Sequence, residues 1–201
     1  YIGGDTLAAV LTRGPEFYRG NNLLVDIGTN GEVVLARDGV LTATSCATGP
    51  VYEGAHIACG VRAVPGAIER VWVEEGRKLR WAAIPEEGER DQRPLGLCGS
   101  GVISTVTALV GAGLVGSDGA FAPAGTHPCL RASPETRQLE ALLVPGRGSR
   151  AGRDIVFTQQ DVRNVQLGKA ALRAGIEILL REHSVTQLDR IYLAGTFGNH
   201  L

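Results

Sequence analysis

Three mainly apolar segments near the start of the chain are separated by turn signals. They span residues 23–27, 32–37 and 40–47, and the pairs Asn30-Gly31 and Asp38-Gly39 lie between them. Asn-Gly and Asp-Gly pairs favour the tight turns of β-hairpins, because these residues tolerate the positive φ that such turns require. The pattern therefore predicts a three-stranded antiparallel meander.

Two later segments have the 3.6-residue period of amphipathic helices. The first covers residues 100–114 and is expected to end at a glycine. The second runs from about residue 158 to residue 183, with Thr158 as its N-cap and Asp161 in the capping-box position.

The remaining segments are less regular. Residues 1–22 are interpreted as a lead-in segment, with a short helix and a linker, from a preceding lobe. Alternation near 71–83 indicates a small inserted β-hairpin, residues 117–153 have no firm periodicity, and residues 191–194 are interpreted as a buried strand. We expect residues 23–201 to form one lobe.

The predicted order is three strands, an insertion, a helix, a loop, a second helix and a strand. We assign this α/β pattern, with its insertions, to the ribonuclease-H-like lobes of actin-type nucleotide-binding proteins, whose strands and helices follow the order β-β-β-α-β-α. The chain contains no Met and stops directly after a strand and its turn. We therefore interpret it as a fragment of a two-lobed domain.

Composition narrows the function classes. The chain has 201 residues, 44% of them apolar and 20% charged, which is typical of a globular protein. Its formal net charge of −1 provides no basic field for nucleic acid or an anionic membrane. No apolar run is as long as a membrane span and no secretory leader opens the chain, so the cytoplasm is the expected compartment. The four cysteines form no Cys-x-x-Cys pair and are expected to be free thiols.

The segment from Asp26 to Gly31 places a carboxylate at the end of a strand, directly before a glycine-bearing turn. Gly28 and Gly31 lack a Cβ, so backbone N–H groups can turn toward an anion. Thr29 and Asn30 add side-chain donors for phosphate oxygens. Asp26 could hold Mg²⁺ through water, because that ion keeps much of its hydration shell. The alternative is an ordinary hairpin in which Asp26 only caps the turn.

Gly195, Phe197 and Gly198 lie in a turn after the last strand, at the other end of the predicted lobe. In actin-like folds such a turn lies against the base and ribose of the nucleotide, where small residues permit a close approach. A glycine turn after a strand is common in itself. Its occurrence together with the Asp26 segment in one lobe is what favours nucleotide binding.

Two further segments carry candidate chemistry. Gly99 and Ser100 open a predicted helix, where N–H groups favour an anion such as phosphate. Alternatively, Ser100 is only the N-cap and the glycines allow close packing.

Ser45 and Cys46 end the third strand, and Glu53, which follows, could orient the water that attacks a γ-phosphate. A hydrolase triad is not indicated, because no oxyanion elbow accompanies these residues.

Five segments, in this order, carry a family resemblance: VDIGTNGEVVL, ATGPVYEGAHIACGVRAVPGAIE, GLCGSG, FTQQDVRNVQLGKAALRAGIEILL and YLAGTFGNH. The sequence resembles the C-terminal actin-like (ASKHA) domain of reductive activators of corrinoid proteins. The resemblance implies an ATPase lobe of a protein that uses ATP hydrolysis to drive the reduction of Co(II) to Co(I) in a corrinoid protein. Complete members carry an N-terminal ferredoxin-like iron–sulfur domain and a two-lobed actin-like domain.

The resemblance also implies roles for single residues. The residues that match the phosphate motif are Asp26, Gly28, Thr29, Asn30 and Gly31, and those that match the adenosine-side turn are Gly195, Phe197 and Gly198. The segment from Ser45 to Glu53 would lie on the corrinoid-protein side, where Ser45, and with less support Cys46, would approach the cobalt. The alternative is that both side chains only complete hydrogen bonds at the end of the strand. The implied cofactors are ATP and Mg²⁺, with an iron–sulfur cluster only in an N-terminal domain outside this sequence. The implied partners are the corrinoid protein and the protein's own ferredoxin-like domain and first lobe, and a homodimer is left open.

Two other functions remain open from the residues alone. One is a lobe of a small-molecule kinase of the acetate or sugar type, and the other is a non-enzymatic actin-like module that binds ATP to regulate assembly. A cysteine-rich ferredoxin segment upstream of residue 1 would favour the corrinoid activator over both.

Overall fold

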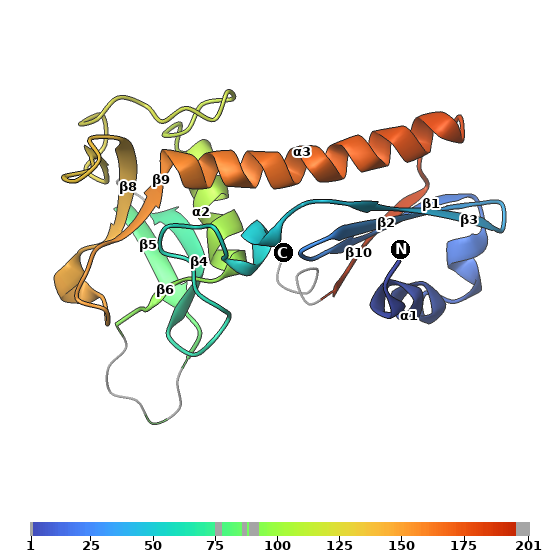
Figure 1. Cartoon of the computed structure of the whole chain (residues 1–201), viewed down its shortest axis with the longest axis horizontal. Coiled ribbons are helices and arrows are strands. Elements are labelled where there is room, and N and C mark those ends of the chain that lie inside the picture. The colour runs from blue at the N-terminus through green and yellow to red at the C-terminus, as the bar shows by residue number, and fades with distance from the viewer. Residues whose placement is uncertain (1, 75–77, 86–87, 89–92, 196–201) are drawn as a thin grey trace. The chain divides into compact units, whose positions relative to one another are not determined.

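The predicted meander is present in the computed structural model, which describes residues 2–74, 78–85, 88 and 93–195. Its strands are β1 (Asn21–Ile27), β2 (Gly31–Arg37) and β3 (Val40–Cys46), which pair antiparallel. A fourth strand, β10 (Arg190–Ala194), pairs parallel with the other side of β1, so the sheet order is β10-β1-β2-β3 (Figure 1). Asp38 and Gly39 both have positive φ, as the predicted tight turn requires.

The connection between β1 and β2 differs from the predicted tight turn. Ile27 pairs with Gly31, so residues 28–30 form a three-residue loop and Gly31 is already in β2. Gly31 does not have a positive φ. Instead, Leu172 and Thr48 occupy the space that a Cβ at this position would need. Packing, and not turn geometry, therefore requires glycine there.

Each face of this sheet has its own apolar core. Leu23, Val25, Val33, Leu35 and Cys46 pack against the second half of α3 (Gln159–Glu182). Leu24, Val34 and Ala36 pack on the opposite face against α1 (Gly4–Thr12) and η1 (Pro15–Tyr18). Because β1 and β2 are buried on both faces, they appear in the sequence as nearly continuous apolar runs. Residues 1–50 and 167–201 form one compact unit that contains this sheet.

The prediction of a buried strand at residues 191–194 is wrong for one face. Tyr192 and Ala194 pack against the core on the α1 side, but Ile191 and Leu193 are 61% and 50% exposed. Within the described residues β10 is an edge strand, and one of its flanks therefore has no strand beside it. An apolar run alone does not distinguish such a strand from a buried one.

Part of the segment predicted as a linker is packed into the core. Residues 15–18 form the 3-10 helix η1, in which Phe17 is fully buried and makes an edge-to-face contact with Tyr192. The Asn22 side-chain amide donates to the carbonyls of Phe17 and Arg19, at 3.0 and 2.7 Å, and so holds this turn against β1.

The second compact unit comprises residues 51–166. Its first sheet has the order β5-β4-β6 and contains the predicted hairpin, because β4 (Ala67–Glu74) and β5 (Lys78–Ala83) pair antiparallel. The short β6 (Gly96–Leu97) leads into α2 (Gly99–Gly111), and Pro50–Glu53 form the 3-10 helix η2. A second sheet was not predicted. It contains β7 (Leu130–Ala132), β8 (Leu139–Val144) and β9 (Ile155–Thr158), and η3 (Gly146–Gly148) precedes β9.

Helix α3 begins at the predicted capping box. The Asp161 backbone N–H donates to Thr158 Oγ1 at 3.1 Å, and the Thr158 N–H donates to Asp161 Oδ2 at 2.8 Å. Asp161 Oδ1 also accepts a bond from the Ala58 N–H at 2.9 Å, so this carboxylate also fixes the chain after η2. Neither α3 nor any other helix in the described residues is both long and apolar enough to cross a membrane.

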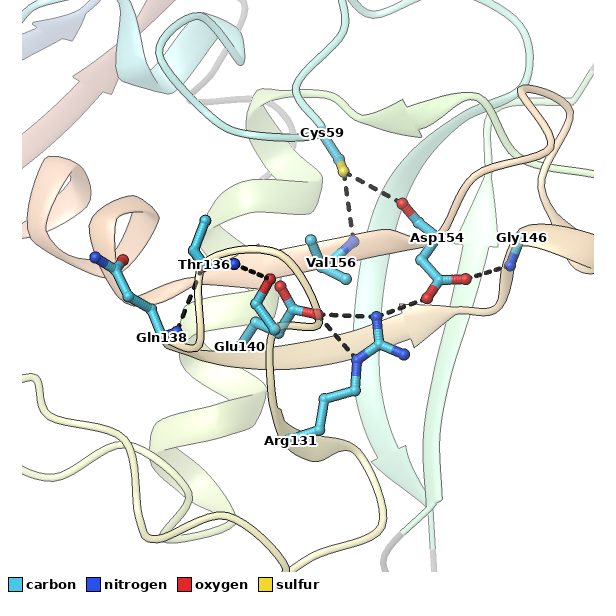
Figure 2. A network of polar contacts seen from close by, with 9 residues as sticks. Cys59, Arg131, Thr136, Gln138, Glu140, Gly146, Asp154 and Val156 are labelled. Atoms are coloured by element: carbon cyan, nitrogen blue, oxygen red, sulfur yellow. Dashed lines mark hydrogen bonds and ion pairs between the residues drawn. The ribbon is translucent and has the colours of Figure 1, made fainter.

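Charged side chains hold the unpredicted sheet together (Figure 2). Arg131 on β7 contacts Glu140 on β8 at 2.8 Å and Asp154, just before β9, at 2.6 Å. Asp154 also accepts a bond from the Gly146 N–H at 2.6 Å. The Glu140 side chain is only 7% exposed, so Arg131 compensates a nearly buried charge. Arg131 and the Gly146 N–H together lower the pKa of Asp154.

Replacing Arg131 with Met is expected to lower the free energy of unfolding by about 2 kcal/mol, because Glu140 would remain buried without a cation. The lowered pKa of Asp154 contributes stability above the unfolded pKa of about 4, and this contribution is lost as the pH falls through the folded value. The decrease in the free energy of unfolding on acidification should therefore be smaller in the Arg131→Met variant than in the wild type. Urea titrations at neutral and acidic pH measure both effects, with Arg62→Met as the control at an exposed site. An equal effect of the two substitutions would contradict the role of Arg131.

Candidate functional site

The structure brings the two predicted nucleotide motifs together at one end of the sheet. Because β1 and β10 are parallel, their carboxyl ends meet, and Asp26 is the register partner of Ala194. Gly195 follows directly and has a φ of +83°, and a Cβ at this position would lie 2.5 Å from Asp26 Oδ1. Glycine therefore lets the backbone turn against the carboxylate. Phe197 and Gly198, the other residues predicted for this turn, lie outside the described residues.

Asp26 is a buried carboxylate at the end of β1, only 8% exposed. The hydroxyl of Thr6, a fully buried residue on α1, donates to Asp26 Oδ2 at 3.4 Å. Burial raises the pKa of Asp26, the negative charge of Asp5 raises it further, and the bond from Thr6 opposes the shift. A carboxylate held in this way is well suited to a cationic ligand, whose charge would offset the burial.

The side chain of Thr48 anchors the loop at residues 28–30 through hydrogen bonds. The Thr48 hydroxyl lies 2.9 Å from the carbonyl oxygens of both Gly28 and Thr29, and the residue is 6% exposed. In a trans peptide the N–H points opposite to the C=O, so the N–H groups of Thr29 and Asn30 point away from Thr48. Both of these side chains are exposed. Successive N–H groups in a short loop, with exposed polar side chains beside them, suit a phosphate group.

A row of polar side chains continues from Asp26 across the sheet. Asp26 is the register partner of Glu32 on β2, and Glu32 is the register partner of Ser45 on β3. The exposed Ser45 donates to Glu32 Oε1 at 3.4 Å. Burial raises the pKa of Glu32, an effect that the bond from Ser45 opposes and the charges of Asp5 and Asp26 increase.

Cys46, the next residue, points the other way. Side chains alternate along a strand, and Cys46 is 7% exposed in the core beneath α3, where its sulfur leaves no room for a Cβ at Gly175. Burial raises the pKa of the Cys46 thiol. Of the two residues predicted to face a corrinoid, only Ser45 is exposed.

The other predicted site residues lie in the second unit. Glu53 is exposed at the end of η2. Gly99 and Ser100 form the start of α2, but Cys98 and not Ser100 is the N-cap residue, and no side chain caps this helix. Gly101, directly after Ser100, allows close packing, since a Cβ at this position would collide with the Ile68 carbonyl. Roles of these residues in catalysis or phosphate binding stay predictions.

Sequence reasoning missed four residues of the site: Asp5, Thr6, Glu32 and Thr48. Glu32 had a usable signal, because any hairpin centred on residue 29 pairs position 26 with position 32. The others reach the site from α1 and from the chain after β3, and no local pattern connects them with Asp26. No group of three or more His, Cys, Asp or Glu able to hold a metal occurs in the part of the chain that the structure describes.

Known proteins match the chain over most of its length. Residues 20–201 match the family described as the C-terminal domain of RACo, the ASKHA domain. The chain is 34% identical over 208 residues to the corrinoid activation enzyme RamQ of Eubacterium limosum. It is 28% identical over 204 residues to the Co(II) methylated amine-specific corrinoid protein reductase of Methanosarcina barkeri. Both alignments cover the whole chain, but only 34% and 36% of the two relatives.

A solved structure has the same fold. The reductive activator for corrinoid, iron–sulfur protein matches with a TM-score of 0.84 and 35% identity, over 98% of this chain and 31% of that chain. These matches confirm the predicted α/β ASKHA fold and the family resemblance. The chain spans about a third of the length of the relatives that it matches.

Proposed function

The chain belongs to the family of the C-terminal ASKHA domain of RACo, and we propose that it is the ATP-binding and ATP-hydrolysing lobe of a reductive activator of a corrinoid protein. In this proposal ATP hydrolysis to ADP and phosphate drives one electron onto Co(II), which becomes Co(I). The electron comes from a reduced iron–sulfur cluster in a ferredoxin-like domain of the same protein, outside this chain. A first ASKHA lobe completes the nucleotide site, and the protein works in the cytoplasm.

The observation that supports nucleotide binding most directly is the meeting of Asp26, the loop at residues 28–30 and Gly195. The donor set fits Mg–ATP. One buried carboxylate with a raised pKa would hold the hydrated cation, and the N–H groups of Thr29 and Asn30 would bind phosphate. Gly195 lets the turn after β10 lie directly against this carboxylate, and the sugar and base would bind beside that turn. Bound Mg–ATP would supply the free energy of the reaction, and the residues named here would orient it.

Ser45 is proposed to approach the axial face of the cobalt when the corrinoid protein docks. It is exposed, small and carries a hydroxyl, so it can come close to a corrin ring without obstruction. Cys46 is not included in this proposal because it is buried beneath α3. Glu53, Gly99 and Ser100 remain proposed contributors from the second unit, as a water-orienting carboxylate and a phosphate-facing helix start.

The proposal is tested with the complete gene product and a set of corrinoid proteins in the Co(II) state. Formation of Co(I), followed by its absorption spectrum, is expected only when Mg–ATP and a low-potential reductant are both present. Phosphate release should rise when the Co(II) partner is added. Phosphate transfer to acetate or a sugar instead would show a kinase lobe, and nucleotide-dependent polymerisation without Co(I) formation would show an assembly module.

A further inference from the structure

One face of the hairpin formed by β4 and β5 carries a tryptophan between two arginines. The guanidinium carbon of Arg70 lies over the Trp72 ring, 5.3 Å from its centre. Arg80 on β5 is the register partner of Trp72. Side chains alternate along a strand, so these three residues extend from the face opposite to the buried Val71. Trp72 is 37% exposed, and its ring is therefore open to a partner.

The charges on this face are mainly positive. Arg70, Lys78 and Arg80 are basic and Glu74 is acidic, and all four are exposed. Glu74 forms an ion pair with Arg80 at 2.7 Å. Within the described ranges of the chain, no carboxylate lies within 4.0 Å of the Arg70 guanidinium. Because the formal net charge of the whole chain is −1, this face is a local basic surface.

The chemistry of this face complements an acidic protein surface. Contact with the Trp72 ring restricts the Arg70 side chain, and its N–H groups can still bind a carboxylate through two parallel hydrogen bonds. Little side-chain entropy would then be lost on binding. Tryptophan and arginine are also the side chains that contribute most to binding at protein interfaces, when a partner removes them from water.

We propose that the face formed by Arg70, Trp72, Glu74, Lys78 and Arg80, the Trp72 face, docks an acidic region of the corrinoid protein. Permanent interfaces are mainly apolar, whereas this face is charged and exposed. It suits a partner that must bind quickly and leave after each reduction, because charge complementarity acts mainly on the rate of association. This inference rests on the proposed function and deepens it by naming a surface for its partner.

The test measures how the complete gene product binds the Co(II) corrinoid protein that the wild type activates. Association and dissociation rate constants are measured by surface plasmon resonance at about 50 mM and about 300 mM salt. The variants are Arg70→Glu and Trp72→Thr, since threonine is well tolerated in strands. Arg62→Glu is the matched control, because Arg62 is an exposed arginine of the same unit that lies outside the hairpin.

At the lower salt concentration, Arg70→Glu is expected to reduce the association rate constant by about tenfold relative to Arg62→Glu. At the higher concentration this difference should shrink to about twofold, because salt screens exposed charges. Trp72→Thr should instead increase the dissociation rate constant by about tenfold, because the aromatic anchor is lost. Both arginine variants should keep the wild-type melting temperature and the wild-type affinity for the Mg²⁺ complex of a non-hydrolysable ATP analogue.

Equal association rate constants for Arg70→Glu and Arg62→Glu would overturn the inference, and so would a difference between them that does not depend on salt. The arginine pair decides the matter even if Trp72→Thr lowers the melting temperature, because both arginines are exposed. If the wild type forms Co(I) in a corrinoid protein, these results count against the docking surface alone. If the wild type forms Co(I) in none, the proposed function is wrong and the docking surface is excluded with it.

Discussion

Asp26→Asn is expected to abolish ATP-dependent activation by the complete gene product and, at the same time, to stabilise the fold. Activity should fall on the order of 10³-fold, because the carboxylate that holds the cation beside the phosphates is lost. Asn has nearly the same shape and can still accept the bond from Thr6. The free energy of unfolding at neutral pH should rise by about 1 kcal/mol, as for other substitutions that relieve an unfavourable functional charge.

The sign of the stability effect follows from the direction of the pKa shift. The folded-state pKa of Asp26 is raised, so the folded protein binds this proton more tightly than the unfolded chain does. The associated stability is present below the unfolded pKa of about 4 and is lost as the pH rises through the folded value. At neutral pH the ionised, buried carboxylate therefore destabilises the wild type, and Asn removes that effect.

Thermal unfolding at neutral and acidic pH, together with the Co(I) assay, measures both consequences. The gain in stability should shrink as the pH is lowered toward 4, because the wild-type carboxylate is then protonated. Asp38→Asn is the matched control, since Asp38 lies in an exposed turn of the same sheet where Asn fits equally well. Undiminished Co(I) formation by Asp26→Asn would show that Asp26 is not part of the active site. A loss of stability in this variant would contradict the conclusion that the buried charge of Asp26 destabilises the wild type.

Gly195→Ala is expected to have the second-largest effect, a loss of about 100-fold in ATP-dependent activity. The new methyl group would lie 2.5 Å from Asp26 Oδ1 and must displace that carboxylate. A displacement of about 1 Å in a catalytic group is enough for such a loss. The positive φ of Gly195 adds a backbone penalty, so stability should also fall by about 1–2 kcal/mol.

A substitution at a second glycine distinguishes the effect of the steric clash with Asp26 from the effect of backbone strain. Gly39 has a φ of +86°, close to that of Gly195, but nothing lies within 4 Å of the position of its Cβ. Gly39→Ala should therefore lose similar stability and keep its activity. Nucleotide affinity by calorimetry, activity and melting temperature are compared for both variants. If the two variants lose activity equally, strain and not contact with Asp26 explains the effect.

The sequence predicted the parts of the fold that depend on neighbouring residues. The Asp38-Gly39 turn and the Thr158–Asp161 capping box are local signals, and both are present. The sheet at β7–β9 was missed because its strands are short and its stability comes from long-range pairs such as Arg131 with Asp154. Gly31 was assigned to a turn because nothing in the sequence shows that Leu172 occupies its Cβ position.

The residues of the candidate site also fall into two groups, those that a local sequence pattern predicts and those that only the fold brings together. Asp26 and Gly195 were predicted from strand ends followed by glycine, and parallel pairing brings them together. Thr6 and Thr48 could not be predicted, because a single threonine is informative only when the fold places its hydroxyl beside a carboxylate or a carbonyl. The opposite directions of Ser45 and Cys46 follow from strand alternation, but only α3 decides which face is buried.

The parallel pairing of β1 with β10 has a consequence for the order in which the protein folds. The antiparallel meander joins neighbouring segments by short loops and can form early, while β10 is separated from β1 by almost the whole chain. Closing so long a loop is slow, because chain entropy must be lost before the contacts form. During synthesis, Asp26 would therefore be in place in the meander well before Gly195 reaches it. The proposed nucleotide site should accordingly become complete only after β10 has been made and has paired with β1.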